Sequence, residues 1–298
     1  MKKVLFTFLV ALIPFLGYMQ TRVEAKTIIN KLNNGESVAY ENATIVGDLD
    51  FRMIKDVEKE RDIEVLFKDN ITFKYHVNNS LQFANCIFQD NFIGYYSEDK
   101  SNELHIVMFH EDVLFANCTF KKDFLVKYTK FYKNASFKST LFEDVALFKY
   151  ARFNSEIDFS NSVFEEDANF KYTNFPMVAN FSKSKFNGEA NFKYTQFEDK
   201  VNFQNSEFNR LANFKYTEIE EFIDFSNVKF NSDAIFKYTK FPEGVSFENA
   251  YFDGYADFKY AILSEPVKLN NVEFDGETSF KYTEVEGKEF VSFLLKNN

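Results

Sequence analysis

The sequence has 298 residues, of which 41 are Phe, none is Trp and only 4 are Pro, so one aromatic residue is used far more often than in an average globular protein. The formal net charge is −10. Such an acidic chain is poorly suited to direct nucleic-acid binding, which needs Lys and Arg to neutralise phosphates. Three His and two Cys leave little material for a metal site, and we expect no metal and no other cofactor.

The N-terminal residues 1–25 have the layout of a secretory signal. Lys2 and Lys3 precede the apolar run VLFTFLVALIPFLGYM, and a polar stretch follows that ends at Ala25. This order predicts a cleaved signal peptide and an exported protein, periplasmic or extracellular. The alternative is an uncleaved anchor, for which the run is short and Pro14 is unfavourable. Removal of this segment, which carries a net +2, changes the net charge to −12, and no later apolar run is long enough to span a bilayer.

Residues 26–42 are predicted to close the N-terminal end of the fold. The stretch KTIINKLNNG places Ile28, Ile29 and Leu32 on one face of a helix, and Gly35 is a typical helix stop. We therefore expect a capping helix here.

A repeat runs from Ala43 to Val285. Large apolar residues, mostly Phe, alternate at spacings of 5 and 6, which fit neither the period of a helix nor that of a strand. A small or β-branched residue stands two positions before each, so both side chains point to the same side of a short extended segment. Four such segments close a coil of 22 residues, and Phe170, Phe192 and Phe214 are predicted to stack above one another.

The units ANFKY, ADFKY, IDFSN and VNFQN resemble those of the pentapeptide-repeat family, in which a small residue, Asn or Asp, and Leu or Phe precede two variable residues. The resemblance covers residues 43–285. It implies an all-β fold, a right-handed quadrilateral parallel β-helix, which is a solenoid. Some members of this family are acidic rods that mimic duplex DNA and bind gyrase, and the resemblance implies this function as an alternative.

Two segments interrupt the repeat and are predicted to leave the wall as insertions. Residues 52–62 are strongly charged, whereas residues 89–102 carry Phe92, Tyr95 and Tyr96. An exposed aromatic loop on a rigid scaffold is a typical recognition element, so we expect these three side chains to form an interaction loop.

Cys86 and Cys118 lie in the matching stretches LQFANCIF and VLFANCTF, at the small inward position of adjacent coils. A coil spacing of ~4.8 Å is within disulfide range, and an exported chain permits the bond. The alternative is that both are small buried residues, because directly stacked positions aim their Cβ atoms alongside one another.

A Lys-Tyr pair recurs at every step of 22 residues, and we call these eight pairs the Lys-Tyr ridge. Its members are Lys127, Tyr128, Lys149, Tyr150, Lys171, Tyr172, Lys193, Tyr194, Lys215, Tyr216, Lys237, Tyr238, Lys259, Tyr260, Lys281 and Tyr282. One interpretation is a straight binding ridge for an anionic or sugar polymer that lies along the axis. The other is a duplicated surface on which Tyr rings stack and Lys keeps the face soluble.

The C-terminal residues 286–298 contain EFVSFLLKNN, which offers Phe290, Phe293, Leu294 and Leu295 as a cap or as the contact of a homodimer. 

Nothing in the sequence predicts a catalytic residue. His76, His105 and His110 come from the irregular N-terminal part and are expected to be solvated, and no phosphate-binding Gly loop or metal-ligand spacing is present. The sequence therefore favours an exported, non-catalytic structural or interaction protein of the bacterial envelope, with an unknown protein or an envelope polymer as partner. Export and the Lys residues of the ridge both count against the gyrase alternative.

Overall fold

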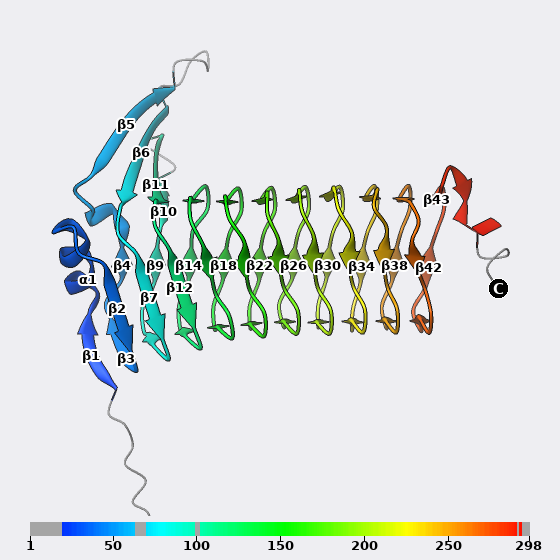
Figure 1. Ribbon diagram of the computed structural model, residues 1–298, viewed down its shortest axis with the longest axis horizontal. Helices are drawn as coiled ribbons and strands as arrows, with labels where there is room; N and C mark the ends of the chain where they lie inside the picture. The colour runs from blue at the N-terminus through cyan, green and yellow to red at the C-terminus, as the bar shows by residue number, and fades with distance from the viewer. Residues whose placement is uncertain (1–19, 63–69, 99–101, 291, 294–298) are drawn as a thin grey trace, which may run out of the picture.

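The computed structural model describes residues 20–62, 70–98, 102–290 and 292–293. Most of the predicted signal segment, together with Leu294 and Leu295, lies outside these ranges. The chain forms a long right-handed solenoid of parallel strands with four walls, as predicted (Figure 1). Among the described residues, no helix is both long and apolar enough to cross a membrane.

Each coil passes through four short strands, and each wall is one sheet built from successive coils. We number the walls in the order in which a coil visits them. Wall 1 contains β2 (Val38–Glu41), β7 (Leu81–Ala84), β12 (Val113–Ala116), β16 (Ala135–Ser136), β20 (Ile157–Asp158), β24 (Ala179–Asn180), β28 (Val201–Asn202), β32 (Ile223–Asp224), β36 (Val245–Ser246) and β40 (Val267–Lys268). Wall 2 contains β1 (Thr21–Glu24), β3 (Ala43–Val46), β8 (Ile87–Phe88), β13 (Thr119–Phe120), β17 (Leu141–Phe142), β21 (Val163–Phe164), β25 (Lys185–Phe186), β29 (Glu207–Phe208), β33 (Lys229–Phe230), β37 (Tyr251–Phe252) and β41 (Glu273–Phe274).

Walls 3 and 4 complete the coil. Wall 3 contains β4 (Leu49–Asp50), β9 (Phe92–Ile93), β14 (Phe124–Leu125), β18 (Ala146–Leu147), β22 (Ala168–Asn169), β26 (Ala190–Asn191), β30 (Ala212–Asn213), β34 (Ala234–Ile235), β38 (Ala256–Asp257) and β42 (Thr278–Ser279). Wall 4 contains β5 (Val57–Asp62), β6 (Asn70–Val77), β10 (Tyr95–Glu98), β11 (Glu103–Phe109), β15 (Lys130–Phe131), β19 (Arg152–Phe153), β23 (Asn174–Phe175), β27 (Gln196–Phe197), β31 (Glu218–Ile219), β35 (Lys240–Phe241), β39 (Ile262–Leu263), β43 (Glu284–Val285) and β44 (Lys288–Glu289).

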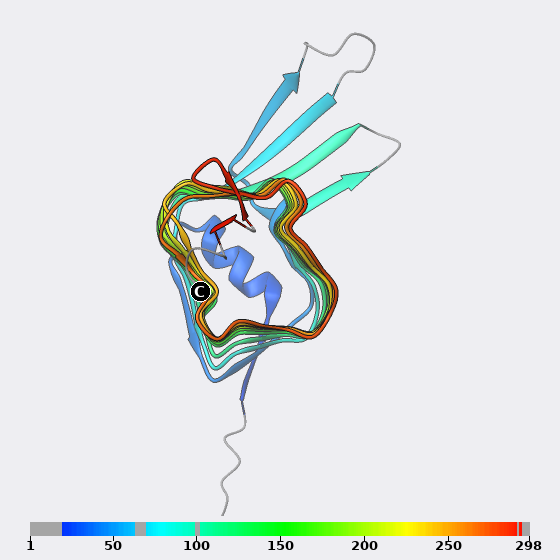
Figure 2. The ribbon, with the colours of Figure 1, turned by 90° about the vertical axis from the view of Figure 1, so that its right-hand side faces the viewer.

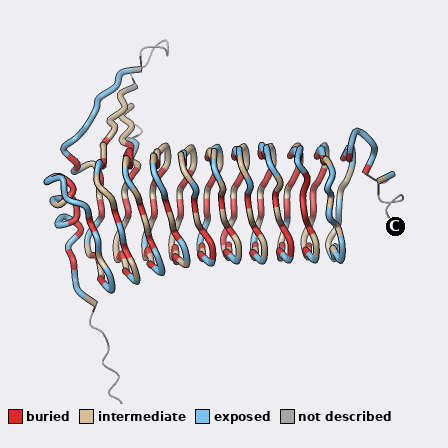
Figure 3. The backbone as a smooth tube through the Cα atoms, in the orientation of Figure 1, coloured by how far each residue is buried: buried red, intermediate tan, exposed pale blue. Residues whose placement is uncertain are grey.

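The bore is filled by the two inward positions of each strand, a small residue and a Phe, while the outward residues remain polar (Figure 3). Strands 22 residues apart pair in parallel, for example Ala190 with Ala212. The Phe rings therefore stack in columns. Ring centroids are 4.9 Å apart between Phe170 and Phe192 and again between Phe192 and Phe214, with planes within 2° of parallel. The predicted stacking is confirmed.

The N-terminal end is closed by helix α1 (Ala25–Asn33), as predicted. Ile28, Ile29 and Leu32 are buried against the first coil, and Gly35 ends the helix with a φ of +77°. The strand before the helix, β1, pairs with β3 in wall 2, and Ala25 is itself buried. Cleavage after Ala25 would therefore remove a strand of the fold.

Two hairpins project from the corner between walls 3 and 4 (Figure 2). Strand β5 pairs antiparallel with β6, and β10 pairs antiparallel with β11. Because β6 and β11 pair in parallel, the hairpins form one sheet with the order β5-β6-β11-β10, which we call the platform. A short 3-10 turn, η1 (Phe51–Met53), leads into the first hairpin. In the first two coils the platform stands where all later coils carry the Lys-Tyr pair.

Candidate interaction site

The Lys-Tyr ridge lies at the corner between walls 3 and 4, where each pair forms the centre of a tight turn. In one coil the N–H of Thr173 donates to the carbonyl of Phe170, which closes a turn around Lys171 and Tyr172. All eight Tyr residues have φ between 58° and 63°. Positive φ at the third turn residue is normally met by Gly or Asn, so Tyr is costly at this position.

The opposite corner, between walls 1 and 2, shows what backbone strain alone selects. There the positive-φ position holds Asn in most coils, for example Asn205, Asn227 and Asn249. The amide of Asn249 also donates to Asn227 at 3.1 Å. The same chain thus uses the favoured residue at one corner and Tyr at the other, so the Tyr side chain itself must provide a compensating interaction.

That interaction is a continuous column of rings. Consecutive Tyr ring centroids are 4.7–5.0 Å apart, and the planes are within 8° of parallel up to Tyr260 and at 25° for the last step to Tyr282. Seven steps of ~4.8 Å give a column about 34 Å long. Each ring face is covered by a neighbouring ring, which leaves the ring edges and phenol groups facing outward.

The Lys side chains lie beside this column. The Nζ atom of Lys193 is 5.0 Å from the ring centroid of Tyr194 and 6.0 Å from that of Tyr216, and most other ridge Lys residues repeat this arrangement. Such cation–π contacts contribute about 0.5–1 kcal/mol at exposed sites. They hold the ammonium groups along the ridge without neutralising them.

No ridge Lys has an ion-pair partner among the described residues. If the ammonium groups follow the coil spacing of ~4.8 Å, each adjacent pair repels by about 1 kcal/mol in water. The pKa of Lys149 is accordingly lowered, first by partial burial and then by the charges of Lys127 and Lys171. The ridge is therefore a line of unneutralised positive charge on an acidic protein.

A shallow groove of about 380 Å³ follows the ridge along wall 4. Tyr194, Tyr216 and Tyr238 form one side of it, and Glu218 and Pro242 belong to the other. The residues across from the ridge change along the axis, from Lys130 and Arg152 near the platform to Glu218 and Glu220 farther on. Positive charge is thus concentrated at the platform end.

The ridge and the platform are continuous. The Nζ of Lys127 donates to the Tyr95 hydroxyl at 3.1 Å, and the ring centroid of Tyr95 is 6.1 Å from that of Tyr128. Tyr96 is 39% exposed and carries the Arg52 guanidinium over its ring at 4.2 Å. Arg52 is in turn fixed by a bidentate contact with Asp50. The sequence pattern gave no indication of Arg52.

Phe92 does not belong to this exposed surface, so the prediction of an interaction loop that contains it is wrong. It is 1% exposed and lies in the bore, 4.5 Å from Phe124 between ring centroids. Phe92 occupies the small inward position, while Gly94 occupies the position of the large residue. A Cβ on Gly94 would meet a methyl carbon of Val107 at 2.8 Å, so the exchange of large and small residues fills the same space.

The geometry of the bore and the comparison with known families agree. A family model described as "Pentapeptide repeats (9 copies)" matches residues 127–174, 170–218 and 214–262. The chain belongs to the pentapeptide-repeat family. No curated protein matches the chain. The pentapeptide-repeat fold is a structural or interaction fold, and its repeats here carry the ridge from Lys127 onward.

The three His residues of this pentapeptide-repeat protein lie at the base of the platform rather than free in solvent. His76 Nδ1 and His110 Nε2 are 2.8 Å apart, and His110 stacks on Tyr132 at 4.6 Å. Burial, followed by the charge of His76, lowers the pKa of His110. His105 accepts or donates a hydrogen bond with the Tyr75 hydroxyl at 2.8 Å. Within the described ranges, no three metal-binding side chains are grouped for a metal ion.

Cys86 and Cys118 are free thiols, which differs from the predicted disulfide. They stack in register next to the paired residues Ile87 and Thr119, so their Cβ atoms run side by side rather than toward each other. Each Sγ instead contacts a main-chain carbonyl, Ala84 at 3.3 Å and Phe83 at 3.4 Å respectively. The hydrogen bond between the two thiols and the burial of the pair raise the pKa of Cys118.

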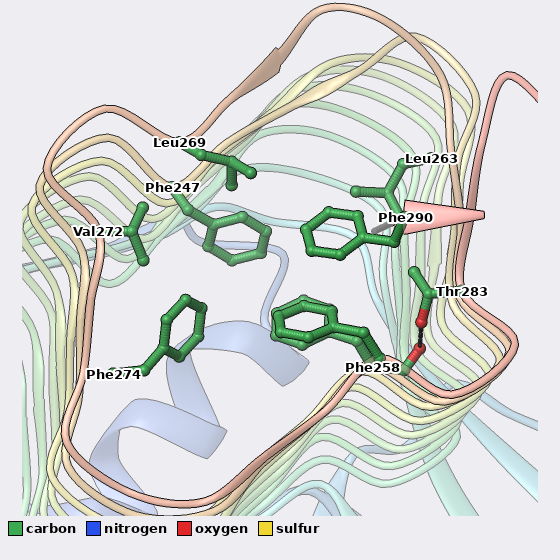
Figure 4. A pocket seen from close by; sticks show the side chains of 9 residues that line it. Phe247, Phe258, Leu263, Leu269, Val272, Phe274, Thr283 and Phe290 are labelled. Atoms are coloured by element: carbon green, nitrogen blue, oxygen red, sulfur yellow. Dashed lines mark hydrogen bonds between the residues drawn. The ribbon is translucent and has the colours of Figure 1, made fainter. Parts of the chain in front are cut away.

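The C-terminal end of the pentapeptide-repeat solenoid is only partly covered. Strand β44 folds back on β43, and Phe290 stacks on Phe280 with 4.3 Å between centroids. A cavity of about 290 Å³ remains between these rings and the last coil, where Phe274 is 37% exposed (Figure 4). This end fits the expected cap, and its residual apolar surface leaves the homodimer interpretation as a hypothesis.

Proposed function

We propose that this protein is an exported, non-catalytic interaction scaffold of the bacterial envelope, and that it binds a linear polyanion along the Lys-Tyr ridge. The observation that carries the proposal is the column of eight Tyr residues at positive φ beside eight Lys residues without ion-pair partners. Backbone strain and charge repulsion both oppose this arrangement in the free protein. A row of anions would relieve the repulsion.

The column geometry favours an anionic polymer over a neutral sugar polymer. A sugar that stacks on an aromatic residue needs a free ring face, whereas the rings from Tyr128 to Tyr282 cover one another. The ridge offers ammonium groups and phenol hydroxyls instead, which are hydrogen-bond donors suited to phosphate or carboxylate oxygens. Their spacing of ~4.8 Å suits a polymer that lies along the axis.

Export is supported by the layout of residues 1–25, in which a basic start and an apolar run precede small residues. Because Thr21–Glu24 pair with β3, we expect any processing to occur before Thr21 rather than after Ala25. An envelope location would also bring the ridge into contact with anionic polymers and would separate it from cytoplasmic gyrase. The uninterrupted Lys line further disfavours a mimic of duplex DNA, which requires a continuous negative face.

Binding of a linear polyphosphate, with neutral dextran as the comparison polymer, tests the proposal. The ridge variant K149Q/K171Q/K193Q and the control variant K138Q/K183Q/K229Q remove the same charge from different faces. We expect the ridge variant to weaken polyphosphate binding at least tenfold and to reduce its salt dependence, while the control loses less than threefold. Equal losses in both variants would show that net charge, and not the ridge, governs binding.

A further inference from the structure

The platform is a four-stranded sheet with two outer edges, β5 and β10, and these edges differ. Strand β5 reads VEKERD, and its alternating charges are the usual protection of an edge against unwanted strand pairing. Its Glu60 also forms an ion pair with Lys74 of β6. Strand β10 begins with Tyr95, Tyr96 and Ser97, which carry no such charges. One edge is protected, and the other is open.

The hydrogen-bond pattern shows which main-chain groups of β10 are unpaired. The N–H of Val107 donates to the carbonyl of Gly94, and the antiparallel register places Tyr96 opposite His105 as the next hydrogen-bonded pair. The main-chain groups of Tyr95 and Ser97 therefore point away from β11. Within the described part of the chain, these groups have no recorded main-chain partner.

The open edge is held rigidly. The Tyr95 side chain is fixed by Lys127 and by the first ring of the ridge column, and Tyr96 is fixed by Arg52. An added strand would thus meet a preformed template, which lowers the entropic cost of binding.

The topology also places this edge near unpaired cations. Strand β6 occupies one side of β11, so β10 and β15 share the other side, and β19 follows β15. A strand added outside β10 would therefore lie at the level of β19. Its inner end would approach Arg152, which is exposed, and Lys149. Neither residue has an ion-pair partner among the described residues.

We propose that the free edge of β10 binds an extended, acidic peptide segment of a partner protein as an additional antiparallel or parallel strand. Main-chain hydrogen bonds from Tyr95 and Ser97 supply the affinity, and acidic side chains near Arg152 and Lys149 supply the specificity. This site is separate from polymer binding along the ridge, which uses side chains of later coils.

Ser97→Pro tests the edge directly. It removes the outward N–H without affecting the bonds of β10 to β11, and Pro is tolerated at such an edge position. Ser97→Ala is the matched control because it keeps the N–H. The probes are fluorescent ten-residue peptides of alternating Val and Glu or alternating Val and Lys, added to the full chain.

We expect the Glu peptide to bind at least tenfold more tightly than the Lys peptide, Ser97→Pro to weaken it at least tenfold, and Ser97→Ala to change it less than twofold. Polyphosphate binding by Ser97→Pro should remain within twofold of that of the parent chain, which separates this site from the ridge. Equal binding of the Glu peptide to the Pro and Ala variants, or equal binding of the two peptides, would overturn the proposal.

Hydrogen exchange on the unsubstituted chain provides a second test that does not depend on the folding of a variant. The Glu peptide should slow exchange of the Tyr95 and Ser97 amides, and the double variant K149Q/R152Q should lose most of this protection. Protection of these amides that rises with protein concentration, in the absence of peptide, would assign the edge to a second copy of the chain and overturn the proposal.

Discussion

Replacing Phe214 by Ala should destabilise the solenoid by about 3–5 kcal/mol. The side chain is fully buried, and its ring is stacked between Phe192 at 4.9 Å and Phe236 at 5.1 Å. It also meets the edges of Phe203 at 5.5 Å and Phe225 at 5.2 Å. The hydrogen-bonded walls hold these neighbours in place, so the space left by the ring cannot collapse. We therefore expect the loss to lie toward the upper end of the range.

The measurement is urea unfolding followed by far-ultraviolet circular dichroism. Phe214→Leu, which keeps most of the volume, should cost about 1–1.5 kcal/mol, and Lys215→Ala, on the adjacent outward position, should cost less than about 0.5 kcal/mol. A loss below about 1.5 kcal/mol for Phe214→Ala would refute the argument that the bore is rigid and close-packed. A comparable loss for Lys215→Ala would refute the assignment of the two positions.

Three further outcomes follow from the geometry. Tyr216→Asn should change unfolding stability by less than about 1 kcal/mol, because relief of the positive φ offsets the lost stacking, and a large loss would contradict this balance. Lowering the pH from 7 to 5 should reduce stability, because unfolding raises the depressed pKa of His110 toward its ordinary value and favours proton uptake by the unfolded chain; His110→Asn should flatten this dependence in the same urea assay. Deleting residues 20–34 should cause aggregation in light scattering, since it uncovers the first coil, whereas a soluble and cooperatively folding product would show that α1 is dispensable.

The coil could be predicted from the sequence because its period is carried by every residue column. Spacings of 5 and 6 between Phe residues leave one arrangement, and the stacking of Phe170 on Phe192 follows from it. The capping helix was equally readable from Ile28, Ile29 and Gly35. Both features depend on local pattern alone.

The platform was less accessible because pairing between distant segments decides it. Residues 52–62 showed charge but no apolar period, so their pairing with β6 could not be inferred. Phe92 was misplaced because the exchange with Gly94 breaks the spacing rule. A comparison of NFIGYY with the later DFLVKY would have aligned Phe92 with Phe124 and revealed its inward position.

The ridge was found as a pattern, but its backbone was not. Positive φ is usually assigned to Gly or Asn, so nothing in the sequence placed it at Tyr172 or Tyr194. Likewise, the pairing of His76 with His110 depends on the parallel alignment of β6 and β11, which is a tertiary feature.

The uniform step between coils makes this molecule a ruler with discrete graduations. Each coil from β15 to β39 contacts only its neighbours, so loss or gain of one 22-residue unit would shift the platform relative to the C-terminal end by ~4.8 Å and leave both ends unchanged. Distance between the two ends can therefore vary during evolution without any new packing solution. Selection on that distance would act on the number of units rather than on individual residues.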